Sequence, residues 1–579
     1  MRRLYLIIVA AILSIGGVVA KEVPSCVAID IARGVLGQAT RGEDVVVAWD
    51  SSALIATRHG VEPTFYVITP ESGRGFVIVA GDDRVAPILA YSTSDKVASC
   101  DMLPENFAAW LRYVDSVVGY VRDGDIAADK ATVEMWSEAY QPVNATLLNT
   151  ARWSQFAPYN IYCPMDGDTQ SLTGCTQTAM AIIMHYNRWP ARAQGVAEPF
   201  TTYTKGIEVP ARDLNHSYDW DNMLYEYVEG EYSQAEGEAV AMLMADLGHS
   251  FKADYAAEST AALPDGVAMY SNYGYSPSCH YVIRNYYSTE SWHELLRSEI
   301  EANRPILYSG YTADQEGHAF VIDGVDDNDY FHVNWGWGGV SNGFFRIDGL
   351  ILDAYLFDTE HWAFLGMHPM RDGEVDNWLY VNAPGMATSA REFNECEPFT
   401  IDAISVVNAA VVSFDGDVRV GVCDIRGEFK SWASEAVGFS IDAGYATSVA
   451  SVVATVEDEI VAGDRLRVYY RSSESDRWFA MLPYADKAQW EILLKQPTIG
   501  DTTSLRFDKS TGVITISHDR DVRVELYMLG SKVEGGVTSM PRYMTIDTSL
   551  LSRGDIYTIY LEREDGSESR SYTFKIKDL

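Results

Sequence analysis

The sequence predicts an α+β protein of several domains, and three observations support this prediction. A chain of 579 residues, with 47% hydrophobic and 22% charged residues, can form several packed cores and lacks the composition of a disordered protein. Helical and strand patterns mix in residues 21–370. In residues 371–579, short apolar runs recur between turn residues, which is typical of β-sandwiches.

Residues 1–20 have the pattern of a secretory signal peptide. Arg2 and Arg3 precede an apolar run at 4–15, and small residues at 18–20 form a cleavage site. The alternative is a retained membrane anchor, but the run is short for a transmembrane span and glycines follow it. No later segment resembles a membrane span. We therefore expect a protein that is exported and is secreted or associated with the cell surface.

Net charge and cysteine content limit the partners and the thiol chemistry. The formal net charge is −38, so nucleic acid and anionic membrane would repel the chain and neither is expected as a partner. Seven cysteines are present, and an odd number in an exported protein leaves at least one free thiol. Three disulfides within domains plus a free Cys175 would use all seven. Spacing does not determine connectivity, so this arrangement is a hypothesis.

Residues 21–145 form the first predicted domain. The β-rich runs at 65–69 and 76–80 flank a turn-like Pro-Glu-Ser-Gly-Arg-Gly segment and predict paired strands. Residues 106–121 place apolar side chains at helical spacing behind Pro104. From its residues alone, this small α+β block shows no group of residues suited to catalysis.

Three further domains are predicted. Residues 146–370 are rich in Trp, Tyr and Gly and mix helices with strands. Runs such as 406–414 predict strands of a β-sandwich module at 371–497, and turn residues around 498–503 separate it from a second β module at 498–579. Neither module shows a catalytic constellation.

The segment LTGCTQTAMAIIMHY at 172–186 predicts a buried helix that begins beside Cys175. Gly174 provides a tight turn before it. A thiol in the first helical turn faces unpaired N–H groups and the positive end of the helix dipole, which favour the nucleophilic thiolate. The structural alternative is a buried cysteine without chemistry, the commoner fate of a lone Cys.

Residues 317–339 predict a hairpin with a strand from His318, a turn at 325–329 and a returning strand. If Gly324 pairs with Asn328, His318 and Asn334 lie directly opposite one another on one face. Asn334 would then orient the imidazole, which serves as general base for the Cys175 thiol.

Further residues complete this constellation. The order Cys, His, Asn and the separation of Cys175 from His318 are those expected of papain-like thiol chemistry. Gln155 and the backbone N–H of Cys175 would form an oxyanion hole. Trp335 and Trp337 would shield the hydrogen bond of the histidine from water.

The other histidines fit less well. His332 shares the hairpin, but it lies on the same strand as Asn334, which cannot orient it across the pair. His185 is expected to be a packing residue of the buried helix. No His-Glu-x-x-His or Cys-x-x-Cys spacing occurs, so we expect neither a metal nor another cofactor.

At this point the chain resembles a known family. TGCTQTAMAIIMHYNRWP, GHAFVIDGVDDNDYFHVNWGWGGVSNGFFRIDGL and AVAMLMADLGHSFKADY closely resemble the streptopain family of secreted papain-like cysteine peptidases, over about residues 150–370. The resemblance implies a papain-like catalytic domain. It also implies that Cys175 is the nucleophile, His318 the base and Gln155 the oxyanion donor. By the same resemblance, Asn334 and Trp335 support the histidine, and Gly317 lies beside the substrate.

The same resemblance extends to the flanking regions. GFVIVAGDDRVAPILAYS at 75–92 resembles the inhibitory propeptide of that family, so residues 21–145 are expected to inhibit the enzyme until they are removed by cleavage between Ala131 and Ala151. The modules at 371–579 resemble extensions of related enzymes that serve secretion or surface retention, which makes them candidates for binding the cell surface.

Two loops depart from the family. The loop before His318 is more acidic, and Ala-Ala-Glu-Ser-Thr-Ala replaces a Gly/Ser-rich loop near the substrate. Ser259, Thr260 and Trp337 are our candidates for binding substrate, together with Gly317, and Glu258 is placed to alter subsite preference. Specificity therefore does not follow from the resemblance.

The expected function is that of a cysteine endopeptidase made as a zymogen, with protein or peptide substrates. An acyl transferase with the same Cys-His-Asn order is the rival enzyme. A catalytically inactive surface adhesin that acts through its β modules is the non-enzymatic rival.

Overall fold

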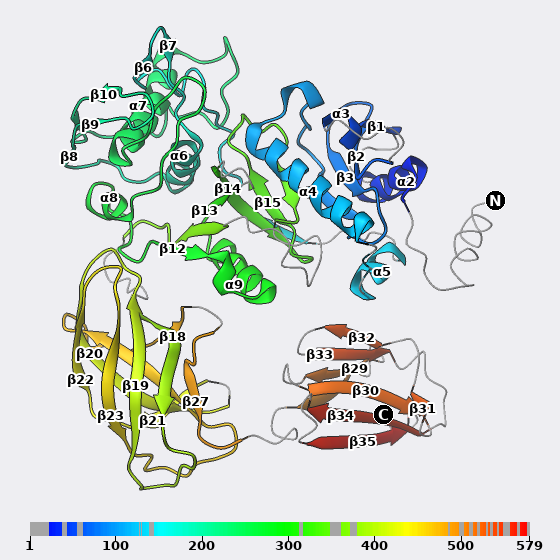
Figure 1. Ribbon diagram of the computed structural model, residues 1–579, viewed down its shortest axis with the longest axis vertical. Helices are drawn as coiled ribbons and strands as arrows, with labels where there is room; N and C mark the ends of the chain where they lie inside the picture. The colour runs from blue at the N-terminus through cyan, green and yellow to red at the C-terminus, as the bar shows by residue number, and fades with distance from the viewer. Residues whose placement is uncertain are drawn as a thin grey trace. The chain divides into compact units, whose positions relative to one another are not determined.

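The computed structural model of the chain is shown in Figure 1. It describes residues 22–496, with gaps at 38–42, 55–61, 125, 127, 129, 138–143, 312–316, 348–360, 371–378, 426 and 485–486, and the strands with adjoining residues within 503–575. The predicted signal peptide, most of the predicted division at 498–503 and most of the acidic loop before His318 lie outside the described residues.

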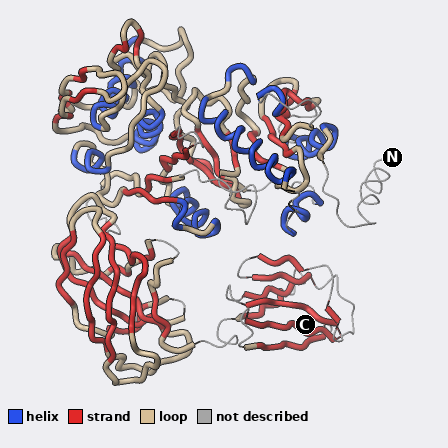
Figure 2. Tube along the Cα trace, viewed as in Figure 1, coloured by secondary structure: helices blue, strands red, loops and turns tan. Residues whose placement is uncertain are grey.

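Two compact units make up the chain. The first comprises Met1–Asp376 with Ala409–Val412, and the second comprises Asn377–Asn408 with Ser413–Leu579. The first unit mixes helices and strands, whereas the described part of the second contains strands without α-helices (Figure 2). The predicted α+β fold class is confirmed. The boundaries at residues 145, 370 and 497 stay predictions.

An antiparallel sheet of eleven strands runs through the first unit. Within it, β4 of the N-terminal block pairs with β16 through Tyr91↔Phe344 and Ala90↔Phe345, so the N-terminal block extends the sheet of the following domain. In spatial order the strands are β1 (Val45–Asp50), β2 (Phe65–Pro70), β3 (Phe76–Ala80), β4 (Ile88–Ser92), β16 (Gly343–Phe345), β15 (Phe331–Asn334), β14 (Gly317–Asp326), β13 (Ile306–Tyr311), β17 (Trp362–Leu365) and β12 (His280–Ile283), with β5 (Ala145–Leu147) beside β14.

Helices and short hairpins complete the first unit. The predicted strands at 65–69 and 76–80 and the predicted helix at 106–121 correspond to β2, β3 and α4 and are confirmed. The helices are α2 (Ser25–Leu36), α3 (Ser51–Leu54), α4 (Glu105–Asp123), α5 (Lys130–Ser137), α6 (Cys175–Asn187), α7 (Gln234–Ser250), α8 (Gly266–Ser271) and α9 (Thr289–Glu301), with 3-10 turns at Cys100–Met102 and Arg284–Tyr286. The hairpin strands are β6 (Met165–Asp166), β7 (Thr169–Gln170), β8 (Val196–Ala197), β9 (Phe200–Thr201), β10 (Glu208–Val209) and β11 (Arg212–Asp213).

Helix α6 begins at Cys175, as the sequence predicts. Its N-cap, Gly174, has φ +92°, a conformation that costs glycine little and other residues much. The nine residues that follow Cys175, from 176 to 184, are all buried, which explains why this helix is apolar on every side. It ends at Arg188, which adopts the left-handed conformation of a C-cap.

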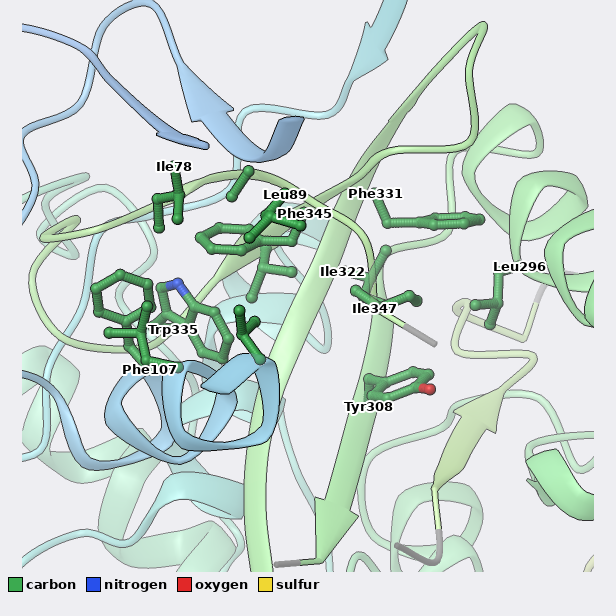
Figure 3. Close-up of a cluster of buried hydrophobic side chains, with 14 of the residues drawn as sticks. Ile78, Leu89, Phe107, Leu296, Tyr308, Ile322, Phe331, Trp335, Phe345 and Ile347 are labelled. Atoms are coloured by element: carbon green, nitrogen blue, oxygen red, sulfur yellow. The ribbon is translucent and has the colours of Figure 1, made fainter. Parts of the chain in front are cut away.

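The two faces of the sheet bury different helices. Leu307, Ala319 and Val321 pack in one core with residues of α6 and α7. Tyr308 and Ile322, their neighbours along β13 and β14, pack in a second core with α9 and with α4 of the N-terminal block. This alternation is the two-residue period of a strand that is buried on both faces. Figure 3 shows part of the second core.

The hairpin of β14 and β15 is confirmed, but its predicted register is wrong. Val321 pairs with Asn334, and Gly324 pairs with His332 instead of Asn328, with a bulge between the two pairs. The reason lies in the turn, because the Asp326 carboxylate accepts hydrogen bonds from the backbone N–H groups of residues 328 and 330 and centres the turn later in the chain. Asn334 therefore lies opposite Val321 and not opposite His318.

The second unit contains two pairs of sheets, and each pair encloses its own core. The predicted strand at 406–414 is interrupted, since β19 ends at Asn408 and β20 begins at Phe414. The first pair comprises β18 (Leu379–Thr388), β19 (Phe399–Asn408), β23 (Ala446–Ala454) and β26 (Leu482–Pro483), packed on β20 (Phe414–Cys423), β21 (Phe429–Trp432), β22 (Val437–Ile441), β24 (Arg465–Ser472), β25 (Phe479–Ala480) and β27 (Glu491–Leu493). The second pair comprises β28 (Ser504–Asp508), β29 (Val513–Ser517), β32 (Val537–Met540) and β33 (Tyr543–Asp547), packed on β30 (Val522–Met528), β31 (Ser531–Lys532), β34 (Ile556–Arg563) and β35 (Ser569–Lys575).

The disulfide hypothesis is wrong, since all seven cysteines are free thiols. In the middle region, Cys163 packs in a small cluster with Tyr255, whereas Cys279 lies in the core around α6. These side chains fill separate apolar sites, which explains why the pairing by sequence order does not occur. Among the described residues, no helix has the length and hydrophobicity needed to cross a membrane.

Candidate active site

The Cys175 thiol lies against the strand that carries His318. The backbone N–H of Ala319 donates to Cys175 Sγ at 3.4 Å, so the sulfur meets the residue that follows His318. Burial raises the pKa of the Cys175 thiol, although the N–H groups of Ala319 and Thr176 oppose this shift. The start of the helix favours thiolate, as expected, because the backbone N–H groups of Cys175 and Thr176 lower the pKa, but the loss of solvation outweighs these donors.

A cavity of about 230 Å³ surrounds this thiol. Its walls bring together six of the residues predicted from the sequence, namely Gln155, Cys175, Ser259, Thr260, His318 and Trp337. Gln155 is held near the helix start, because the N–H of Thr173 donates to Gln155 O at 3.3 Å. Asn334 and Trp335 do not line the cavity, and neither does Gly317, which pairs with Tyr311 at the start of β14.

His318 is the second residue of β14 and lies directly opposite Gly310 of β13. Gly310 leaves room for another imidazole, since a Cβ at that position would lie 3.2 Å from His361 Nε2. The other ring nitrogen of His361 hydrogen-bonds with the Tyr308 hydroxyl at 2.8 Å. Side chains of paired residues share a face, so His361 lies on the side of the sheet to which His318 belongs. Sequence reasoning missed His361.

Asn334 is buried and bonds away from the predicted partner. Its Nδ2 donates to Thr150 Oγ1 at 3.0 Å and to Ala151 O at 2.9 Å, and its Oδ1 accepts from the N–H of Gly336 at 3.2 Å. The Thr150 hydroxyl continues this network, because it donates to the buried Asp323 carboxylate.

His332, which the sequence disfavoured as the general base, has a structural partner in the same network. His332 is buried, and its Nδ1 lies 2.5 Å from Asp323 Oδ1. A histidine tied to a buried carboxylate and packed against Phe344 is held by the fold and does not line the cavity. His185 is also a packing residue, as expected, since its ring lies 4.7 Å from that of Trp153.

The two tryptophans differ in their surroundings. Trp335 is 2% exposed, and its indole N–H donates to Ser341 O at 3.0 Å. Trp337 is partly exposed at the cavity wall, where its ring lies 5.6 Å from that of Phe156. Trp337 therefore lines the cavity, whereas Trp335 belongs to the hydrophobic core.

Comparison with known proteins identifies the family. The sequence model of the Peptidase C10 family matches residues 153–345, and that of the Spi protease inhibitor matches residues 20–118. Streptopain of Streptococcus pyogenes is 35% identical over 308 residues, which cover 49% of this chain and 74% of streptopain. The chain belongs to the Peptidase C10 family.

Two further proteins are similar to this C10 peptidase. The thiol protease/hemagglutinin PrtT of Porphyromonas gingivalis is 29% identical, over 50% of this chain and 34% of PrtT. A prointerpain A fragment of Prevotella intermedia matches with 27% identity and a TM-score of 0.45, over 53% of this chain and 96% of that fragment. The chain is a cysteine-type peptidase that carries a propeptide-type inhibitor domain.

The inhibitor domain of this C10 peptidase contributes a residue to the cavity. Asn106, in the first turn of α4, lines the cavity with Cys175 and His318. Its Nδ2 donates to Trp335 O at 2.8 Å, and its Oδ1 accepts from the N–H of Phe107 at 2.9 Å. This role of Asn106 could not be predicted from the sequence, because an asparagine near the start of a helix usually indicates a local capping residue.

The loop at 256–263 forms one wall of the C10 cavity. The Thr260 hydroxyl donates to Ala256 O and accepts from the N–H of Ala256, both at 3.1 Å, so it closes the loop on itself. Ser259 and Glu258 are exposed at the tip. Of the two predicted hydroxyls, only that of Ser259 is left to meet a substrate. Among the described residues, no three His, Cys, Asp or Glu side chains converge to hold a metal ion.

Proposed function

We propose that this C10 peptidase is an exported zymogen of an endopeptidase, in which Cys175 is the nucleophile and His318 the general base. Gln155 and the backbone N–H of Cys175 donate to the oxyanion. Asn334 and Trp335 support the histidine strand from the core. Ser259 and Trp337 flank the bound substrate chain, Thr260 closes the loop that carries Ser259, and Gly317 starts the strand before His318 without lining the cavity.

The reaction follows from these roles. His318 takes the thiol proton, and the sulfur attacks the scissile carbonyl to form a C–S bond. The protonated imidazole gives that proton to the leaving amine as the C–N bond breaks. Water, deprotonated by His318, then cleaves the thioester, which releases a carboxylate and restores the thiol.

One observation supports this assignment above the others. The sulfur at the start of α6 and the residue after His318 are in hydrogen-bonding contact at 3.4 Å, and Gln155 lines the same cavity. Residues far apart in the chain thus line one cavity, which supports the roles proposed for them.

Latency is part of the proposal. Asn106 of the inhibitor domain occupies the cavity wall beside Cys175, and Phe107 packs on Trp335 with ring centroids 5.7 Å apart (Figure 3). A substrate chain cannot take the place of α4 while these contacts persist. Removal of residues 21–145 would therefore open the cavity and expose the thiol.

Processing of the Cys175→Ala precursor tests the function. We expect wild-type precursor, incubated under reducing conditions, to mature with a new N-terminus between Ala131 and Ala151 and to cleave denatured casein. Cys175→Ala should remain full length and inactive, because the nucleophile is gone. SDS gels and N-terminal sequencing give the readout, and the variant Cys396→Ser, which changes an exposed thiol, should mature normally.

Two results would contradict the proposal. Maturation of pure Cys175→Ala would exclude self-processing through this thiol. Incorporation of a labelled amine into casein without peptide-bond cleavage would favour the acyl transferase.

The proposal also includes export of the protein and its retention at the cell surface. The charged, apolar and small-residue pattern of residues 1–20 is the basis for export. For the β modules at 371–579, binding of the full-length Cys175→Ala protein to the producing cells tests surface retention. Recovery of all protein in the medium would contradict it.

A further inference from the structure

We infer that Glu258 selects substrates with a Lys or Arg side chain at the subsite formed by the 256–263 loop. This inference rests on the proposed function, since it names the substrate class of the same cavity. Glu258 lines the cavity that contains Cys175, and it is the one carboxylate among the described lining residues.

The loop holds Glu258 in a fixed relation to the nucleophile. The Thr176 hydroxyl, one residue after Cys175, donates to Ala262 O at 2.8 Å and ties the loop to α6. Asp254 and Ala261 pair as an antiparallel bridge, with Asp254 N donating to Ala261 O at 2.8 Å. The loop therefore closes on itself and is anchored to the catalytic helix, and Glu258 at its exposed tip lines the cavity.

The neighbouring lining residues suit a long side chain with a charged end. Leu172, Ala262 and Leu263 provide apolar wall, and Leu263 is 58% exposed. Lys and Arg side chains place their methylene stems along such surface and keep the charge at its edge. An apolar wall with one carboxylate at its rim is complementary to these two side chains. An acidic side chain at this subsite would be repelled.

Among the described residues, Glu258 forms no ion pair. Lys205 Nζ lies 3.4 Å from Asp166 Oδ2. That same Asp166 oxygen accepts from the N–H of Ala257 at 3.1 Å, so the Lys205 charge is already paired where it meets the loop. The chain as a whole carries a net charge of −38, which adds to the attraction for a cationic substrate.

The effect should be moderate and sensitive to salt. Partly exposed charge pairs are weak and are screened over about 10 Å at 0.1 M salt. We expect roughly a 3- to 10-fold preference in kcat/KM for Lys or Arg over Gln at one substrate position, which decreases as the salt concentration rises.

A set of matched peptides tests the inference on the mature enzyme, with its β modules at 371–579 retained. Internally quenched peptides differ at a single position, from four residues before the scissile bond to three after it, and carry Lys, Arg, Gln or Glu there. We expect one position to favour Lys and Arg. In Glu258→Gln the ratio of kcat/KM for Lys over Gln should fall to about 1, and in Glu258→Lys the preference should shift toward Glu. Glu301→Gln, an exposed carboxylate at the end of α9, is the control and should leave the ratio unchanged.

Two results overturn the inference. One is an enzyme without a basic preference at any position, and the other is a preference that persists in Glu258→Gln. Both are distinct from failure of the proposed function, which would appear as casein cleavage that survives Cys175→Ala. If Cys175→Ala loses cleavage and the wild-type enzyme has no basic preference, the role of Glu258 is contradicted but the proposed function is not.

Discussion

Cys175 combines a position suited to nucleophilic attack with surroundings that keep its thiol protonated. It begins α6, where backbone N–H groups stabilise a negative sulfur, yet burial raises its pKa. Asn106 of the inhibitor domain lines the same cavity, so the propeptide helps to enclose it. Removal of that domain should therefore lower the pKa of the thiol.

This account predicts the pH dependence of Cys175 alkylation. Only thiolate reacts, so a raised pKa means that the rate in intact precursor keeps rising with pH beyond about 8.5, where an ordinary thiol is half ionised. In mature enzyme the rise should occur at lower pH. Iodoacetamide labelling followed by mass spectrometry of the Cys175 peptide measures both profiles, with the exposed Cys396 as internal reference. Identical profiles before and after maturation would exclude this coupling.

Which residues line the cavity was easier to predict than the hydrogen bonds that they form. Cys175 and His318 follow from local signs: a glycine before an apolar helix, and a histidine at the start of a strand. The partners of Asn334 did not follow, because the Asp326 carboxylate sets the hairpin register and no pattern of alternation reveals it. A bulge also separates Ile322 from Gly324, and an odd shift in register moves a side chain to the other face.

At the scale of elements, the start of α6 depends on Gly174. A Cβ there would lie 2.5 Å from Gln177 Oε1 and 2.8 Å from Thr260 O, and the backbone has φ +92°. The helix, Cys175 and the loop that carries Glu258 therefore meet at a position where only glycine fits.

Gly174→Ala should disturb both stability and activity. Strained backbone costs about 1–3 kcal/mol, and the clash with Thr260 O adds to this. We expect a lower midpoint in urea unfolding and a fall of at least about 10-fold in kcat/KM, since Cys175 would move. Gly167→Ala is the matched control, because Gly167 has φ +62° but no atom within 4 Å of an added Cβ. Equal loss of activity in both variants would show that backbone strain, and not the Thr260 contact, is responsible.

Helices and strands were predictable wherever local periodicity was strong. The helix at 106–121 and the strands at 65–69 and 76–80 appear as expected, since their apolar spacing matches one kind of element. The run at 406–414 reads as one strand but is interrupted after Asn408. The residues remain apolar across the position where the strand ends, and this end is determined by tertiary contacts.

Across the first unit, the inhibitor domain and the peptidase domain share one sheet and one core. Strand β4 pairs with β16, and Phe107 of α4 packs between Trp335 and Phe345, with centroid distances of 5.7 and 5.9 Å. Pairing of strand edges far apart in the chain leaves no mark in local sequence, so this continuity could not be predicted. It means that the inhibitor is held by burial as well as by the contact in the cavity.

Phe107→Ala should therefore weaken latency. Truncation of a buried Phe costs about 3–5 kcal/mol, and this residue lies at the junction of the two domains. We expect the variant precursor to mature several-fold faster and to react faster at Cys175 before cleavage. Tyr120→Ala, on the exposed side of the same helix, should mature at the wild-type rate. A Phe107→Ala precursor that matures no faster than wild type would argue that this contact plays no part in inhibition.

Covalent labelling of the mature enzyme with an epoxysuccinyl peptide, followed by mass spectrometry of every cysteine peptide, tests the central assignment most directly. All seven cysteines are free, and removal of residues 21–145 takes away Cys26 and Cys100, so the reagent meets four competing thiols in the mature enzyme. We predict one adduct per molecule, on Cys175, formed in parallel with loss of peptidase activity and slowed strongly in His318→Ala. An adduct on another cysteine that accounts for the loss of activity, or full activity in molecules labelled at Cys175, would contradict the account.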